Sequence, residues 1–372
     1  MKKYFLDTMS GGLCYVAKID SRRIESFLKK NGWTPAKKLE KADIIIVNTC
    51  AYCTEAERRS IQTIKKYKKL KDKKTKLIVG GCLPIINKRK MLTVFKGPFF
   101  TPHTLSFLSK IIKAKHYNID EIPTAQPIIT DSSNTISRKE EKVFCIRVGY
   151  GCLNRCSFCA VNKVFPKLIS KSIEQIIKEF KAGLKYGYQN FIITGEDSSA
   201  YGLDIGTNLN ELLKKLISIK TKKRINISLY RLNPRWLIKM GLDFIKILKS
   251  KKINYLSIPI NSGSDRILKL MNRGHKAKEV KDYIKKIKKT LFIKINYDIM
   301  VGFPGETEKD FKDTLRFVLE TKPNNIRVFL YTDRPGAKAK YLGKKILPEI
   351  MKKRAEQLYK TAGLTWQPQF KK

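Results

Sequence analysis

Residues 142–159 read KVFCIRVGYGCLNRCSFC, an apolar strand-like segment followed by a glycine and three closely spaced cysteines. The cysteines, Cys152, Cys156 and Cys159, have the spacing C-x3-C-x2-C. Three thiolates in one short loop can hold three irons of a 4Fe–4S cluster and leave the fourth iron open. A zinc site would need a fourth cysteine or histidine, and none of the three histidines lies near the loop in sequence. The segment therefore predicts an iron–sulfur site after a strand.

Apolar segments of strand length recur after this loop, with helical patterns between them. The clearest helical pattern covers residues 173–184, and Ser172 with Gln175 forms a capping pair before it. Six strands joined by helices predict an open, partial (β/α)6 barrel over residues 142–347, with the motifs on its catalytic face. The expected strands are residues 144–148, 190–194, 225–229, 255–260, 293–300 and 326–331.

The first third of the chain predicts a separate α/β domain. Residues 42–47 and 76–79 are continuous apolar runs, typical of parallel strands buried on both faces, and residues 55–74 between them have helical spacing. We expect a flavodoxin-like parallel-sheet domain over residues 1–118 and a linker rich in Pro, Ser and Thr over residues 119–141. A basic helix and tail are expected over residues 348–372.

A second set of cysteines follows strands or turns in this first domain. Cys14 begins the pattern C-x5-D-S, Cys50 ends V-N-T-C, and Cys82 ends G-G-C. Parallel strands bring their C-terminal loops to one edge of the sheet, so these three thiols can converge and hold a second cluster with an open iron. The alternative is three scattered core cysteines. Cys53 and Cys145 fit neither set, and each is expected to be a buried small side chain or a spare thiol.

The charge of the chain favours a polyanionic partner. Lysine and arginine number 78 against 32 aspartate and glutamate residues, a formal net charge of +46. Such a protein repels itself unless a polyanion such as a nucleic acid neutralises it, although a compositional bias towards lysine would also spread charge over every solvated face. The candidate phosphate-binding helices, each of which could also be a solvated face, are residues 65–76, 281–289 and 352–360.

The sequence favours a cytoplasmic protein with no membrane partner. No apolar run approaches the roughly 20 residues that a membrane span needs, and the N-terminus lacks the apolar segment of a signal peptide. The eight cysteines are grouped as metal ligands are in a cytosolic chain, and not as in a disulfide framework.

The cysteine loop, with an aromatic residue before its last cysteine, resembles the radical-SAM signature. This resemblance implies that S-adenosylmethionine (SAM) binds the open iron and is cleaved to a 5′-deoxyadenosyl radical. It also implies that Phe158 lies near the adenine, or that it is a packing aromatic. Three later blocks and the second cysteine set are similar to the methylthiotransferase family, in which an auxiliary cluster supplies sulfur. The blocks are N-S-G-S-D (261–265), D-I-M-V-G-F-P-G-E-T (298–307) and R-P-G (334–336).

Residues 194–206 resemble the archaeal and eukaryotic branch of this family, which acts on N6-threonylcarbamoyladenosine. By this resemblance the SAM-contacting side chains are Phe158, Glu196, Asn261 and Ser262, with Asp197 as the polar neighbour of Glu196. An ordinary acidic loop is the alternative reading of residues 194–206. Asn261 stands where the family usually has glutamine, and the sequence around Cys14 lacks the family's usual Gly and Asn.

The resemblance implies a transferase that converts C2–H of N6-threonylcarbamoyladenosine-37 in tRNA to C2–SCH3. One SAM would supply the radical and another the methyl group, and the cofactors would be two 4Fe–4S clusters and SAM. The implied partners are tRNA, a sulfur source, and an electron donor such as ferredoxin or flavodoxin. The sequence stops near Lys372, where relatives continue into an RNA-binding TRAM domain, so we expect charge to offset that loss. The alternatives are methylthiolation of a ribosomal protein side chain and a non-catalytic Fe–S protein that binds RNA.

Overall fold

The computed structural model describes residues 2–7, 14–129 and 142–365. The chain divides into two units, residues 1–147 and 148–372. The predicted domain boundaries at residues 118 and 142 remain predictions. Residues 130–141 of the predicted linker and residues 366–372 of the predicted tail lie outside the described residues.

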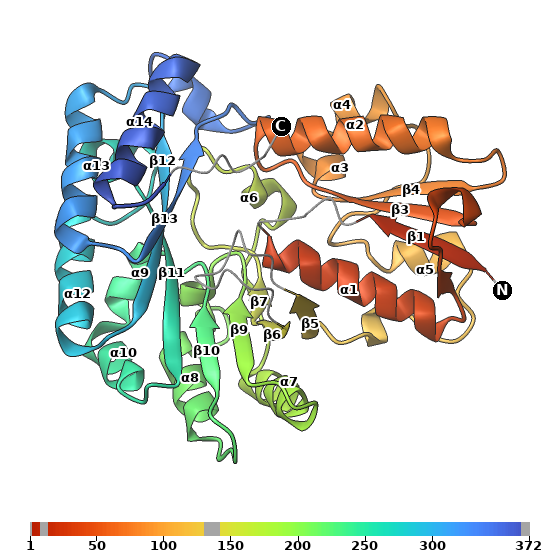
Figure 1. Ribbon diagram of the computed structural model, residues 1–372, viewed down its shortest axis with the longest axis horizontal. Coiled ribbons are helices and arrows are strands. Elements are labelled where there is room, and N and C mark those ends of the chain that lie inside the picture. Colours follow the sequence, from red (N-terminus) through yellow and green to blue (C-terminus); the bar gives the residue numbers. More distant parts are fainter. Residues whose placement is uncertain (1, 8–13, 130–141, 366–372) are drawn as a thin grey trace. The chain divides into compact units, whose positions relative to one another are not determined.

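The N-terminal unit contains a parallel four-stranded sheet in the order β2-β1-β3-β4. Its strands are β1 (Lys3–Asp7), β2 (Thr34–Pro35), β3 (Ile44–Thr49) and β4 (Lys76–Gly81). Every residue of β3 is buried, as its apolar sequence predicts for a central parallel strand. Helices α1 (Tyr15–Lys30) and α2 (Thr54–Leu70) cover opposite faces of the sheet (Figure 1). The predicted strand–helix–strand over residues 42–79 is confirmed.

A buried apolar cluster holds α1 and the sheet of this unit together. It includes Phe27 of α1, Ile46 of β3, Ile78 of β4 and the ring of Phe100. The strands β5 (Gln126–Ile129) and β6 (Lys142–Arg147) pair antiparallel at the end of the unit, and α1 packs against both. The shorter elements are η1 (Leu39–Lys41), α3 (Leu83–Ile86), α4 (Lys88–Leu92), α5 (Phe107–Ile112) and η2 (Ile119–Glu121).

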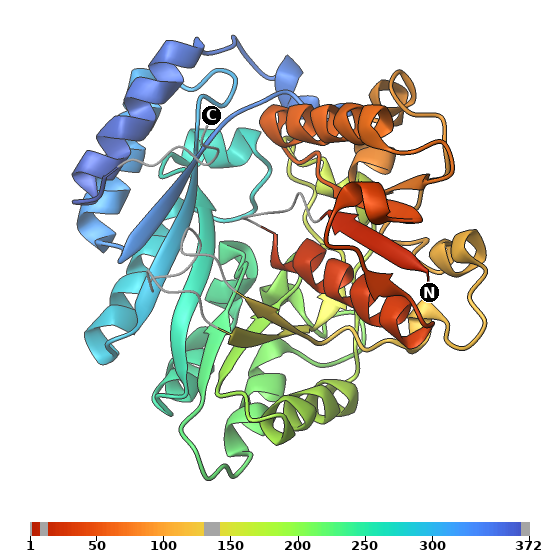
Figure 2. The same cartoon turned by 45° about the vertical axis from the view of Figure 1, so that its right-hand side comes forward.

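The second unit repeats strand and helix. Five parallel strands lie side by side in chain order, and Figures 1 and 2 show them as a curved row with helices along its outer side. They are β9 (Asn190–Thr194), β10 (Asn226–Leu229), β11 (Ile253–Asn261), β12 (Lys294–Val301) and β13 (Asn325–Leu330). These five strands and β6 are the six strands that the sequence predicts. The predicted fold class, a parallel-sheet domain followed by a partial radical-SAM barrel, is confirmed.

Several helices of the second unit start at polar caps. Ser172 accepts a hydrogen bond from the Gln175 amide at 3.2 Å and begins α7 (Ile173–Lys185), as the sequence predicts. The other elements are β7 (Gly149–Tyr150), α6 (Val161–Val164), β8 (Ile169–Ser170), η3 (Ser198–Ala200), α8 (Leu209–Ser218), α9 (Pro234–Lys239), α10 (Gly241–Leu248), α11 (Asp265–Leu270), α12 (Ala277–Thr290), α13 (Glu308–Thr321), η4 (Lys338–Tyr341) and α14 (Pro348–Thr361). Within the described residues, no helix combines the length and the apolar character that crossing a membrane requires.

Candidate functional site

The three-cysteine loop of the second unit begins at a glycine that no other residue could replace easily. Gly151 has a φ of +85°, and a Cβ atom there would lie 1.7 Å from the carbonyl oxygen of Lys167. The Gly151 amide donates to Glu196 Oε2 at 2.9 Å. Glu196, which the sequence predicts to contact SAM, therefore orients the start of the cysteine loop.

The first thiol of the loop lies in a buried polar group. Cys152 Sγ accepts hydrogen bonds from the backbone and side-chain nitrogens of Asn154 at 3.3 and 3.2 Å and donates to Asp197 Oδ2 at 3.6 Å. Asn154 also donates to the same Asp197 oxygen at 2.7 Å. Burial, followed by the charge of Asp197, raises the pKa of Cys152. This thiol is therefore held as a proton donor to the carboxylate.

The other two thiols of the loop face cationic or N–H groups. Arg273 Nη1 lies 3.4 Å from Cys156 Sγ. Burial raises the pKa of Cys159 to about 11, while hydrogen bonds from the amides of Val161 and Asn162 oppose this rise. Such donors stabilise a thiolate or a cluster sulfur, because they place positive charge beside it. Arg273 is only 4% exposed.

The middle of the loop is held from two sides by later segments of the same unit. The Ser157 amide and hydroxyl donate to the carbonyls of Met271 and Leu270 at 3.1 and 2.8 Å, at the end of α11. The Ala339 amide of η4 donates to the Ser157 carbonyl at 3.0 Å. Phe158 packs against a buried cluster that includes Phe303, as its packing interpretation predicts.

The segment that resembles the archaeal and eukaryotic branch lies directly against this loop. Asp197 is buried, and its second oxygen accepts from Ser199 at 2.7 Å. Burial raises the pKa of Asp197, while Ser199 and then Arg273 oppose this rise. A narrow pocket is lined by Gly151, Glu196, Asp197 and Tyr201, among other residues. The acidic residues of this segment therefore belong to the surroundings of the cysteine loop.

The N-S-G-S-D block follows β11 and contains two of the predicted SAM contacts. Asn261 has a φ of +66°, is 7% exposed, and its Oδ1 has no hydrogen-bond partner among the described residues. Ser262 is fully buried, and its hydroxyl already contacts Thr314 Oγ1 at 3.3 Å and the Ser264 amide at 3.1 Å. Asn261 thus has an acceptor to offer a ligand, whereas the Ser262 hydroxyl has protein partners.

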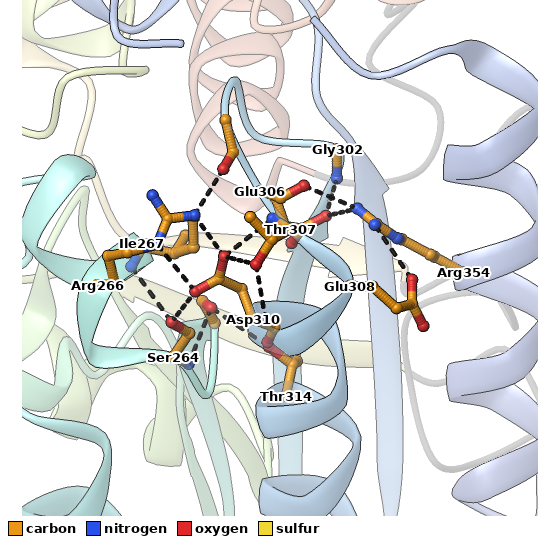
Figure 3. Close-up of polar contacts among 12 residues, drawn as sticks. Ser264, Arg266, Ile267, Gly302, Glu306, Thr307, Glu308, Asp310, Thr314 and Arg354 are labelled. Atoms are coloured by element: carbon orange, nitrogen blue, oxygen red, sulfur yellow. Dashed lines mark hydrogen bonds and ion pairs between the residues drawn. The ribbon is translucent and has the colours of Figure 1, made fainter. Parts of the chain in front are cut away.

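The G-F-P-G-E-T block is tied to the N-S-G-S-D block through Asp310 (Figure 3). Asp310 accepts from Ser264 Oγ at 2.6 Å and from Thr307 Oγ1 at 2.5 Å, and it forms an ion pair with Arg266. Thr307 and Asp310 also form the capping box of α13. Asp310 therefore connects the loop that follows β11 to the start of α13.

A helix near the C-terminal end of the chain holds the second of these blocks. Figure 3 shows Arg354 of α14 reaching Glu306, which also accepts from the Gly302 amide. The Arg354–Glu306 pair is 2.6 Å long, and both side chains are buried. A Cβ atom on Gly302 would lie 2.1 Å from Met351 Sδ. Residues 348–361 therefore support the loop that follows β12.

The second cysteine set lies in the N-terminal unit at the C-terminal edge of its sheet. Cys14 is the N-cap of α1, and Cys82 is the N-cap of α3. The Cys82 amide donates to the carbonyl of Thr49, the residue before Cys50, at 3.0 Å. Burial and then the neighbouring thiols of Cys14 and Cys53 raise the pKa of Cys50 to about 12. The structure thus brings Cys82 beside the Cys50 segment and puts Cys14 within electrostatic reach of Cys50.

The G-G-C sequence has a steric cause. A Cβ on Gly80 would lie 2.0 Å from the Phe100 ring, and one on Gly81 would lie 2.2 Å from the Thr49 carbonyl oxygen. Gly81 also has a φ of +94°. Both glycines are needed for β4 to end close enough to β3 for the contact between Cys82 and Thr49.

The D-S and V-N-T-C patterns are also linked. Asn48 donates to Ser21 Oγ at 2.8 Å, which fixes α1 against the end of β3. Asp20 is buried within 3.6 Å of Arg147. Of the two remaining cysteines, Cys145 is fully buried in β6 and Cys53 is half-buried at the start of α2. No two of the eight cysteines, all of which the structure describes, form a disulfide.

The donor sets fit iron–sulfur clusters by their chemistry. Each set offers three thiols, none of which is taken up by a disulfide. Within the described ranges, no group of three or more Cys, His, Asp or Glu side chains is arranged so that it could hold a metal ion. The thiol of Cys152 donates to Asp197, so a metal would replace this proton and redirect the sulfur.

Sequence reasoning missed several residues of this site as contacts. It gave no role to Arg273, Asn154 or Ser157. The available signal for Arg273 was its position shortly after the N-S-G-S-D block. No local pattern pointed to the contact of Ser157 with η4, because the two segments are far apart in sequence.

Comparisons with known proteins agree with both units. Residues 146–318 match the Radical SAM superfamily, and residues 4–98 match the uncharacterized protein family UPF0004. The chain is similar to a probable threonylcarbamoyladenosine tRNA methylthiotransferase of Methanocaldococcus jannaschii, with 34% identity over 93% of this chain and 80% of the relative. It is also similar to a tRNA-2-methylthio-N(6)-dimethylallyladenosine synthase of Caldicellulosiruptor saccharolyticus, with 32% identity over 93% of this chain and 75% of the relative. A ribosomal protein uS12 methylthiotransferase of Thermoanaerobacter sp. is 30% identical over 93% of this chain and 80% of its own length.

Solved structures show the same fold at low identity. The radical S-adenosylmethionine methyltransferase TsrM from Kitasatospora setae, solved with cobalamin and a 4Fe–4S cluster bound, has a TM-score of 0.62 and 13% identity. The match covers 91% of this chain and 77% of that structure. The fold, the two matched domains and the identity to relatives along most of their length all agree: this chain belongs to the radical-SAM methylthiotransferase family and is an enzyme that transfers a sulfur-containing group.

Proposed function

We propose that this enzyme converts C2–H of N6-threonylcarbamoyladenosine-37 in tRNA to C2–SCH3. The observation that carries the proposal is the contact between the branch-typical segment and the cysteine loop: Glu196 accepts from the Gly151 amide, and Asp197 contacts Cys152. The similarity to the relative from Methanocaldococcus jannaschii supports the same substrate. A tRNA substrate also favours a cytoplasmic location.

In the second unit, Cys152, Cys156 and Cys159 would hold the cluster that binds SAM. When bound and reduced, this cluster and SAM supply the radical that abstracts hydrogen from the substrate carbon. The protein's own contribution is electrostatic. Arg273 lies beside Cys156 and Asn154 donates to Cys152, and donors of this kind would stabilise the sulfur atoms of cluster ligands.

The predicted SAM contacts have different roles in this proposal. Asn261 supplies a buried acceptor that has no partner within the described residues, and we assign it to SAM. Glu196 orients the Gly151 turn, and Phe158 packs beneath the loop, so both position the site as well as lining it. Ser262 acts on the neighbouring loop through Ser264 and Thr314.

In the N-terminal unit, Cys14, Cys50 and Cys82 would hold the auxiliary cluster. We assign to this second cluster the sulfur that is transferred. A sulfur source and an electron donor such as ferredoxin or flavodoxin complete the reaction, because neither electrons nor sulfur come from the tRNA.

Of the lysine-rich helices α2 and α12, α2 is the better candidate to bind RNA phosphates. On α12, Lys281 and Lys285 are both paired with Glu320, so their charge is partly neutralised. On α2, Lys65, Lys68 and Lys69 line an open hollow of about 440 Å³ with Thr93 and Val94. Phosphate contacts supply most of the affinity that does not depend on sequence. We therefore assign tRNA backbone binding to this lysine hollow.

The decisive experiment is mass spectrometry of tRNA nucleosides from cells with and without the gene. We expect 2-methylthio-N6-threonylcarbamoyladenosine to disappear without the gene and to return with the parent enzyme, but not with Cys152→Ala. An unchanged nucleoside profile together with loss of a modification on ribosomal protein uS12 would contradict the tRNA assignment. That outcome would leave the radical-SAM chemistry in place.

An iron measurement tests the two clusters separately. Anaerobically reconstituted enzyme should hold close to two 4Fe–4S clusters, and the variant with Cys152, Cys156 and Cys159 replaced by alanine should keep about one. A triple variant that loses no iron would refute the assignment of these cysteines.

A further inference from the structure

The strands of the second unit alternate between residues that face its helices and residues that face the inner side of the curved row. The ring centroids of Tyr297 in β12 and Phe317 in α13 lie 5.9 Å apart, and those of Phe191 in β9 and Phe180 in α7 lie 4.2 Å apart. Successive side chains of a strand point to opposite sides. The neighbours of Tyr297 in β12 therefore face the inner side, away from the outer helices in Figure 2.

Four side chains of this inner side are polar, where a barrel interior is usually filled by branched apolar residues. Ser257 of β11 lies opposite Asn296 of β12. Two residues further along β12, Asp298 lies opposite Arg327 of β13. Residues that are paired in parallel register share one side of the sheet, so these four form a polar layer across three strands.

Arg327 and Asp298 form a two-point ion pair within the polar layer. Nε and Nη2 of Arg327 donate to Oδ1 and Oδ2 of Asp298 at 2.7 and 2.8 Å. The two side chains remain 17% and 12% exposed, so a ligand on the inner side can reach them. A pair of this kind is often no more stabilising than apolar residues of the same volume. Ligand recognition explains charges at this place better than stability does.

Ser257 adds a hydroxyl group that has no protein partner among the described residues. Its side chain is fully buried, and its Oγ makes no hydrogen bond there. Leaving a buried hydroxyl without a partner costs free energy. A polar ligand group at the inner side would remove this cost.

The polar layer lies below the edge of the sheet at which the chemistry takes place. Asp298 precedes Val301, the last residue of β12, by three residues, or roughly 10 Å. Asn261 ends β11, four residues after Ser257. Active sites of such barrels lie at the C-terminal ends of the strands. A substituent that extends from a base held at this edge can therefore reach the polar layer.

Resting on the proposed tRNA substrate, we propose that the N6-substituent of the target adenosine enters the barrel along its inner side and that its carboxylate binds Arg327. Asp298 engages Nε and Nη2 and fixes the guanidinium plane, so Nη1 supplies the donors for the substrate carboxylate. Ser257 supplies a hydroxyl for a second polar group of the substituent.

This arrangement distinguishes a threonylcarbamoyl group from a dimethylallyl group at the same nitrogen. The threonylcarbamoyl group carries a carboxylate and a hydroxyl, whereas the dimethylallyl group has only apolar atoms and offers neither contact. A site built to hydrogen-bond a substrate group rejects an analogue that lacks this group by about 10⁴–10⁵-fold. Arg327 and Ser257 are thus specificity-determining residues of the enzyme.

The test compares turnover of the full-length holoenzyme on two tRNAs, one with threonylcarbamoyl-adenosine and one with dimethylallyl-adenosine at position 37. The main variant combines Arg327→Gln with Asp298→Asn, because removing both charges leaves no buried charge unpaired. Arg327→Lys is a second variant that keeps the charge and loses the planar fork. The matched control combines Lys171→Gln with Glu179→Gln, which removes another buried ion pair of the same unit.

The readout is the ratio of kcat/KM for the two tRNAs, measured by mass spectrometry of their nucleosides. A merely structural defect lowers both values alike and leaves this ratio unchanged. We expect the parent and the control to favour the threonylcarbamoyl tRNA equally, and the double variant to lower the ratio about 100-fold or more. Arg327→Lys should lower it about tenfold.

A ratio that stays at the parent value in both Arg327 variants would overturn the assignment of the polar layer to the substrate. Where the double variant does not fold, as judged by its iron content and circular dichroism, Arg327→Lys decides alone. A parent enzyme that does not turn over the threonylcarbamoyl tRNA at all would instead overturn the proposed function.

Discussion

Replacing Arg354 with methionine should destabilise the second unit strongly, because it leaves the buried Glu306 carboxylate without its cation. The Arg354 and Glu306 side chains are 8% and 1% exposed, and their charged atoms lie 2.6 Å apart. Removing one partner of such a pair typically costs about 3–5 kcal/mol. The additional pair with the exposed Glu308 contributes less than about 1 kcal/mol. We therefore expect a loss of about 4 kcal/mol, a large part of the roughly 5–15 kcal/mol that stabilises a typical domain.

The assay is urea unfolding of the variant, followed by tryptophan fluorescence and circular dichroism. The matched control is Arg316→Met, whose ion pair with Asp313 is solvent-exposed and should cost less than about 1 kcal/mol. Adding Glu306→Gln to Arg354→Met should recover part of the loss, because the amide keeps an acceptor for the Gly302 amide without a buried charge. A loss no larger than in the control, or strictly additive effects in the double variant, would refute this reasoning.

The pH dependence of the Arg354→Met variant has a definite sign. Burial raises the pKa of Glu306 even with Arg354 present. A carboxyl whose folded pKa lies above its unfolded value of about 4.3 stabilises the fold at low pH and loses this contribution as pH rises through the folded pKa. Removing the arginine raises that pKa further. The deficit relative to the parent should therefore be smaller at pH 5 than at pH 8, and a deficit that grows on acidification would contradict the assignment.

Two further changes test the N-terminal unit. The first variant replaces Lys65, Lys68 and Lys69 of the lysine hollow with glutamate and should weaken tRNA binding, measured by filter binding. The slope of log affinity against log salt concentration should become shallower by about 0.9 for each phosphate contact that is lost. An unchanged slope would place the RNA elsewhere. Gly81→Ala should remove the auxiliary iron, because its Cβ would collide with the Thr49 carbonyl. Gly32→Ala has a similar positive φ but open space around it, so it controls for backbone strain and should keep both clusters.

The sequence predicts the strands and helices of this fold well. Apolar runs such as residues 44–47 and 190–194 identify buried parallel strands, because burial on both faces leaves few other residues possible. The spacing of Cys152, Cys156 and Cys159 places these thiols on one loop without any knowledge of tertiary structure. The apolar composition of short segments was sufficient for the first inference, and the spacing of neighbouring cysteines was sufficient for the second.

The contacts that orient the site could not be predicted in the same way. In the sequence, Arg354 is one of several cations on a basic helix. In the structure, its side chain is buried against Glu306. The resemblance assigns Glu196 to SAM binding, but in the structure its carboxylate accepts a hydrogen bond from the Gly151 amide. Both contacts join segments more than forty residues apart, and side-chain spacing along one segment carries no information about them.

The two-sided support of Ser157 sets an order of events during biosynthesis. The ribosome completes the three cysteines long before it reaches Ala339, whose amide fixes the Ser157 carbonyl. Until then the loop lacks one of its two supporting segments, and its thiols are not held in their final positions. We therefore expect iron loading of the second unit to follow translation of η4, and nascent chains that end before Ala339 should remain iron-poor there even when iron is plentiful.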